Sequence, residues 1–191
     1  MTENYSRKIE LSDKSVIVVS GDKFWESNAG AIQNTKTVIE NLLGKKDVRN
    51  MEIHILAYLF SDRSEFSTEM IELLEECLNR RNEIWMIVNH LYERWDDDGE
   101  YKMPVDELER LNKHENFHLY SFEKEGDNAI LHAKVIVVDR SVAFIGSANI
   151  TKQAMKRNYE IGLRVEGSHA ESLARMVTGL AHDKEFCKEI S

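Results

Sequence analysis

The sequence contains few of the residues that interrupt a chain or cross-link it. Its 191 residues include one proline, nine glycines and two cysteines, and no segment is rich in Pro, Gly or Ser. Separate domains joined by a linker are therefore not expected. A chain of this length with 42% hydrophobic residues can bury a sizeable core. We predict one domain over residues 1–191.

Long hydrophobic runs are also absent. No stretch reaches the ~18 consecutive apolar residues of a transmembrane helix, and residues 1–8 lack the apolar segment of a secretory signal. Cys77 and Cys187 lie far apart in helix-like segments, and two such thiols are expected to be reduced rather than paired. These features favour a cytoplasmic protein without a membrane contact.

The apolar residues follow a pattern in which strands and helices alternate. Predicted strands cover residues 15–20, 51–58, 83–89, 117–122, 135–138, 142–145 and 158–165. Predicted helices cover residues 32–44, 71–78 and 104–111, and a last helix begins at the capping box Ser168-His-Ala-Glu171. This order predicts an α/β fold with a mixed, mostly parallel central β-sheet and helices on both faces.

One predicted hairpin carries polar side chains at its open end. His132 and Lys134 are two residues apart, so in a strand they share a face. A turn near Asp139 reverses the chain, and the second strand ends at a glycine followed by Ser147 and Asn149. If the pairing follows the turn, Ser147 and Asn149 return to the level of His132 and Lys134.

These side chains suit an attack on a phosphodiester. The reaction needs a nucleophile, positive charge near the phosphoryl oxygens and an acid for the leaving alkoxide. His132 is the candidate nucleophile and Lys134 the cation, while Asn149 and Ser147 can donate hydrogen bonds. Glu160 could accept from the far ring nitrogen of His132 and fix its tautomer. No residue of this set remains to serve as the acid, and no metal or other cofactor is expected.

The pattern His132-x-Lys134-x4-Asp139-x6-Gly-Ser-x-Asn149 resembles the signature of the phospholipase D superfamily at every motif position. Asn158-Tyr-Glu160 resembles the downstream Asn-x-Glu of that family. The resemblance implies a phospholipase D-like fold and a phosphohistidine intermediate that water hydrolyses. In that family the histidine of a second motif copy supplies the acid. Asp139 belongs to the candidate catalytic set through this signature, although its spacing favours an ion pair or a turn-capping role.

The sequence holds one copy of the motif. Of the other six histidines, only His182 is followed two positions later by lysine, and neither the aspartate nor the Gly-Ser-x-Asn of the motif follows Lys184. A site with two histidines must then be built by two chains about a two-fold axis, with His132 of both protomers in one cleft. We therefore predict a homodimer.

The formal charge of −9 opposes binding of a polyanion, but it is unevenly distributed. Residues 129–164 carry six basic and two acidic side chains, a charge of +4, which leaves −13 elsewhere. Lys152 and Lys156 are four apart and would share a helix face after Asn149, beside Arg157. Together with Ser147 they are candidate substrate-binding residues. A merely solvated helix face is an equal alternative.

Three functions remain open. The first is a metal-independent nuclease acting on DNA or RNA, since the family members with a single motif that this chain resembles are largely endonucleases, several in phage-defence settings. The second is a phospholipase or phosphatidyltransferase, which the absence of a basic amphipathic helix and of a second motif disfavours. The third is a dimeric assembly subunit that keeps the hairpin for structure and recruits a larger nucleic-acid-processing or defence complex through a protein partner.

Overall fold

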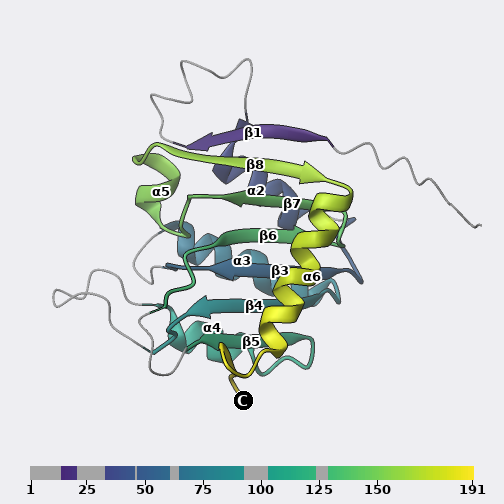
Figure 1. The fold of residues 1–191 in the computed structure, drawn as a ribbon, viewed down its shortest axis with the longest axis vertical. Helices are drawn as coiled ribbons and strands as arrows, with labels where there is room; N and C mark the ends of the chain where they lie inside the picture. The colour runs from purple at the N-terminus through teal and green to yellow at the C-terminus, as the bar shows by residue number, and fades with distance from the viewer. Residues whose placement is uncertain (1–13, 21–32, 46, 61–64, 93–102, 124–128) are drawn as a thin grey trace, which may run out of the picture.

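The computed structural model describes residues 14–20, 33–45, 47–60, 65–92, 103–123 and 129–191. Within these ranges the strands form a nine-stranded sheet in the order β2-β1-β8-β7-β6-β3-β4-β5-β9 (Figure 1). The strands are β1 (Ser15–Ser20), β2 (Gln33–Asn34), β3 (Glu52–Ala57), β4 (Glu83–Asn89), β5 (Phe117–Phe122), β6 (Lys134–Val138), β7 (Val142–Gly146), β8 (Glu160–Glu166) and β9 (Cys187–Glu189). The helices are α2 (Thr35–Gly44), α3 (Glu65–Asn79), α4 (Val105–Leu111), α5 (Lys152–Lys156) and α6 (Ser168–His182).

The sheet is mixed, as predicted, but it is not mostly parallel. Of the pairings between described strands, β1 with β2, β3 with β4 and β4 with β5 are parallel, and the other five are antiparallel. The βαβ pattern of the first half gives the parallel strands. Hairpins and an antiparallel return strand build the second half. The motif strand β6 is the fifth of nine and therefore central, as predicted.

Helices cover both faces of the sheet (Figure 1). Along β6, Val135 and Val137 pack in the core beneath α6, whereas Ile136 and Val138 pack in the core shared with α2, α3 and α4. This alternation requires apolar residues on both faces, which explains why β6 is apolar at every position after Lys134. In Figure 1, α6 crosses its face diagonally and does not cover the parts of β1, β8 and β7 nearest α5.

Two local predictions near the C-terminus are wrong. The capping box does not form, because the N-cap of α6 is Gly167 at φ 74° and no side chain caps the helix. Ser168 is the first helical residue instead, and its carbonyl accepts a hydrogen bond from Ser172 Oγ. Cys187 lies in strand β9 rather than in a helix, and both Cys77 and Cys187 are buried free thiols.

The predicted hairpin is confirmed. Lys134 pairs with Gly146 and Val138 with Val142, and Asp139 and Arg140 make the turn with φ 51° at both residues. Gly146 in turn pairs with Gly162 of β8. A Cβ atom added at Gly146 would lie 2.9 Å from Gly162 Cα, so the glycine of the motif allows β7 and β8 to approach closely.

In the parts of the chain that the structure describes, none of the helices combines the length and apolar character needed to cross a bilayer.

Candidate active site

The β6–β7 hairpin brings the motif residues to one end of the sheet. β6 begins at Lys134 and β7 ends at its partner Gly146, so His132 precedes one strand where Ser147 and Asn149 follow the other. His132 is exposed, Asn149 is half-buried and Lys134 is buried, with 5% of its surface accessible. The candidate nucleophile His132 is thus open to solvent, whereas the ammonium-bearing Lys134 is buried.

Lys134 is fixed by its own strand. Its Nζ donates a hydrogen bond to the backbone oxygen of His132 at 2.8 Å. Burial lowers the pKa of Lys134 from its ordinary value, and the negative charge of Glu160 acts in the opposite direction. The position of the ammonium and its charge therefore both depend on residues of the motif.

Tyr58 is a member of the site that sequence patterns did not indicate. Its ring centroid lies 4.6 Å from that of the His132 imidazole, with 58° between the ring planes. Lys134 Nζ lies 4.8 Å from the same tyrosine centroid. The sequence shows an aromatic residue directly after the buried strand β3, but no local pattern relates that position to His132.

Glu160 and Ser147 join β8 to the end of β7. Ser147 Oγ donates to Glu160 Oε2, and Asn158 Nδ2 donates to Glu160 Oε1 at 3.1 Å. Ser147 Oγ also accepts from the backbone nitrogen of Ile161 at 3.2 Å. We expected Glu160 to bond the ring of its own His132, but among the described residues its carboxylate bonds Ser147 and Asn158 instead.

The side-chain oxygen of Asn149 is an unsatisfied hydrogen-bond acceptor. This Oδ1 atom is buried and has no hydrogen-bond partner within the described part of the chain. Such a buried polar atom is unfavourable unless a ligand or a second chain supplies a partner. The residue at the end of the signature is thus left ready to interact.

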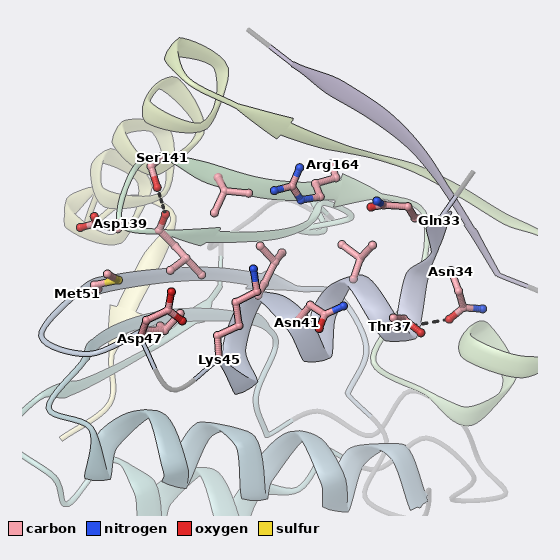
Figure 2. A pocket seen from close by; sticks show the side chains of 15 residues that line it. Gln33, Asn34, Thr37, Asn41, Lys45, Asp47, Met51, Asp139, Ser141 and Arg164 are labelled. Carbon is pink, nitrogen blue, oxygen red and sulfur yellow. Dashed lines mark hydrogen bonds between the residues drawn. The ribbon is translucent and has the colours of Figure 1, made fainter. Parts of the chain in front are cut away.

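Asp139 lies away from the other motif residues. It occupies the turn at the opposite end of β6 from Lys134, about 16 Å away at ~3.3 Å per strand residue. Its backbone nitrogen donates to Glu52 O at 2.7 Å, and the Arg140 guanidinium bonds the Glu52 carboxylate, also at 2.7 Å. Asp139 also lines a groove of ≈ 680 Å³ between α2 and the sheet, where Figure 2 shows it with Lys45, Asn41 and other polar side chains.

The basic candidate substrate-binding residues lie on α5 and at its C-cap, Arg157, whereas Ser147 follows β7. The predicted helix forms directly after the motif, and its N-cap Thr151 accepts from Ala154 N at 3.2 Å. A bridge between Phe60 and Ile150 ties this segment to the chain that follows β3. Lys152, Lys156 and Arg157 are exposed on this element. Within the described ranges, no three His, Cys, Asp or Glu side chains gather in a way that could hold a metal ion.

Residues 49–182 match the sequence profile of a family described as "Cardiolipin synthase, PLD-like domain". The chain belongs to the phospholipase D superfamily. The match covers strands β3 to β8 and every motif position from His132 to Glu160, and members of this superfamily are phosphodiesterases.

One curated relative is similar to this chain in sequence, and two solved structures share its fold. The DISARM protein DrmC of Bacillus paralicheniformis is 30% identical over 129 residues, which are 66% of this chain and 50% of DrmC. This chain therefore spans half the length of that relative. Nuc of Salmonella typhimurium, a phospholipase D family member, has a TM-score of 0.62 at 16% identity and covers 93% of this chain and 98% of its own. The phosphatidylserine synthase of Haemophilus influenzae has a TM-score of 0.62 at 14% identity, with 93% of this chain and 40% of its own covered.

Proposed function

We propose that this chain is a metal-independent nuclease that cleaves DNA or RNA through a phosphohistidine. The observation that carries the proposal is the position of His132, Lys134 and Asn149 at one end of the β6–β7 hairpin. The exposed imidazole can reach a phosphodiester in solvent. The Lys134 ammonium and the Nδ2 group of the Asn149 amide can donate hydrogen bonds to the phosphoryl oxygens.

The reaction proceeds in two displacements. A ring nitrogen of His132 attacks phosphorus, and the P–O bond to the leaving alkoxide breaks as an imidazolium donates a proton to that oxygen. Water then attacks the phosphohistidine and gives a proton back to the second imidazole, which frees His132. Lys134 and Asn149 offset the charge on the phosphoryl oxygens in both steps, so no metal is required for that purpose.

The second imidazole is His132 of another copy of the chain. Four apolar side chains are exposed on the face of the sheet that carries α6. We call them the β8 patch: Ile17, Ile145, Ile161 and Leu163. Leu163 pairs with Ile17 on one side and with Ile145 on the other, so the patch is continuous across three strands. It borders the site, because Ile161 N donates to Ser147 Oγ at 3.2 Å. A second copy seated on this patch would bring two motifs together.

The substrate is a nucleic acid rather than a lipid. Residues 129–164 carry a formal charge of +4 in an otherwise acidic chain, and Lys152, Lys156 and Arg157 are exposed beside the motif. The relative from Bacillus is named a DISARM protein, and we place this chain in a defence setting of the same kind, with a protein partner in a larger complex.

The test measures cleavage in excess EDTA for the wild type, His132→Ala and His114→Ala. The substrates are DNA, RNA and phospholipid vesicles. We expect fragments from a nucleic acid, a loss of at least ~10³-fold in His132→Ala and no loss in His114→Ala, which changes an exposed histidine after α4. Release of headgroup from vesicles alone would favour a phospholipase. Activity that requires added Mg²⁺, or that survives in His132→Ala, would contradict the mechanism.

A further inference from the structure

Tyr58 lies where one ring contacts both reactive side chains of the motif. The His132 imidazole is tilted against it, with centroids 4.6 Å apart, and the Lys134 ammonium lies 4.8 Å from its centroid. The tyrosine is half-buried and belongs to the chain leaving β3, which is a different segment from the hairpin.

The strand register explains this position. β3 and β6 are antiparallel, with Ile53 opposite Val138 and Leu56 opposite Val135. Tyr58 follows Ala57, the last residue of β3, so the segment that carries its ring passes the start of β6, where Lys134 and the preceding His132 lie. On the other side of β6, Lys134 pairs with Gly146, which has no side chain. The tyrosine ring is therefore a large group against Lys134 at this end of β6.

Both contacts have a physical consequence. A cation over an aromatic face is attracted by the ring quadrupole, and the attraction is stronger when the pair is shielded from water. Burial acts against the charge of Lys134, so the ring offsets part of that unfavourable effect. Tilted aromatic pairs also prefer particular orientations, which restricts the rotation of the exposed imidazole.

We propose that Tyr58 is a positioning residue that keeps Lys134 charged and orients the His132 ring for attack on phosphorus. This inference rests on the proposed function, because it assigns a role within the same site. The phenol itself takes no part in bond making, so the aromatic face is the required feature and phenylalanine can replace it.

Three variants separate the ring from the hydroxyl group and from general effects. Tyr58→Phe should keep kcat within about threefold of the wild type. Tyr58→Leu should lower kcat by about 10- to 30-fold with KM little changed, on the scale of a shielded cation–π contact. In Tyr58→Leu the alkaline limb of the pH–kcat profile should also move to lower pH, because Lys134 loses its proton more easily. The control is Tyr92, an exposed tyrosine hydrogen-bonded to Glu109. Tyr92→Leu should change neither kcat nor the alkaline limb.

A measurement on the unaltered protein needs neither activity nor a folded leucine variant. The tyrosine ring current should shift the ε-methylene protons of Lys134 upfield in the NMR spectrum, with the resonance assigned by its loss in Lys134→Arg. Tyr58→Phe should preserve the shift. An ordinary chemical shift for these protons, or wild-type kcat and pH profile in folded Tyr58→Leu, would overturn the inference. Absence of cleavage by the wild type together with a shifted Lys134 resonance would reject the proposed function and leave the contact established.

Discussion

Lys134 carries its charge in a position that burial makes unfavourable. Burial lowers its pKa, and the Glu160 carboxylate raises it. Replacing Glu160 by Gln should therefore lower the pKa of Lys134 further. The alkaline limb of the kcat/KM profile should move to lower pH, because the cation is lost earlier as pH rises.

The matched control for this prediction is Glu166→Gln. Glu166 lies at the other end of β8, where it pairs with Arg164 at 2.6 Å. Its replacement should leave the alkaline limb where it is in the wild type. Equal profiles for Glu160→Gln and the wild type would show that the charge of Glu160 does not act on Lys134.

His54 links protonation to stability on the face beneath α6. Its ring is buried, and Nε2 lies 3.1 Å from Thr178 Oγ1, which itself donates to Ala174 O. The hydroxyl therefore accepts from Nε2–H. The unprotonated Nδ1 has no hydrogen-bond partner among the described residues. Burial lowers the pKa of His54, partly opposed by Glu52, so the folded state favours the neutral ring.

The sign of the stability effect follows from this lowered pKa. The unfolded chain binds the proton more readily, so the stability is present above the ordinary histidine pKa of ~6.5 and is lost as pH falls below it. Urea midpoints at pH 7.5 and 5.5 should differ more in the wild type than in His54→Leu. Replacing the exposed His114 by Leu should preserve the wild-type difference. The same pH difference in His54→Leu as in the wild type would contradict this assignment.

Among the structural elements, β7 and β8 approach most closely at a pair of glycines. A Cβ atom at Gly146 would lie 2.8 Å from Phe144 Cζ and 2.9 Å from Gly162 Cα. Gly146→Ala should therefore separate the strands and destabilise the protein by about 1–3 kcal/mol in urea unfolding. Gly179→Ala is the control, because a Cβ there meets nothing within 4 Å in α6, and it should stabilise by up to about 1 kcal/mol. Equal effects of the two changes would reject the close approach as the reason for the glycine.

The apolar pattern was sufficient to predict the longer elements. β1, β4 and β5 have the predicted bounds, since five or more alternating or buried residues mark a strand clearly. β2 and β9 contain two and three residues and are too short to show a period. Their existence depends on neighbouring strands, which local sequence does not describe.

The same limit explains what the sequence predicted of the site. His132, Lys134, Ser147 and Asn149 belong to one hairpin, whose turn and apolar runs fix their proximity. Tyr58 meets them through the register of β3 against β6, a pairing between residues about eighty positions apart. The partners of Glu160 depend likewise on how β8 continues from β7. Local patterns therefore predict the hairpin part of the site, and the remaining contacts depend on long-range strand pairing.

For the whole molecule, the β8 patch predicts which surface substitution should prevent dimerisation. Leu163 is central in the patch and 42% exposed, while Met176 on α6 is 47% exposed outside it. Leu163→Glu should convert the proposed dimer to a monomer in light scattering and remove cleavage, because a buried unpaired charge is strongly unfavourable. Met176→Glu should remain dimeric and active. A dimeric Leu163→Glu would place the interface elsewhere.

The composite site also predicts how activity depends on the mixture of chains. In the proposed composite site, the two histidines come from different protomers, because the sequence holds one copy of the motif. After subunit exchange between equal amounts of wild-type and tagged His132→Ala chains, about a quarter of the dimers hold two histidines. Total activity should fall to about a quarter of an all-wild-type sample, whereas independent sites would leave about half. Exchange with His114→Ala chains should leave activity unchanged, and pull-down by the tag verifies that mixed dimers have formed. Because the two models differ twofold at the same chain concentration, a value near half would establish that each chain carries a complete site.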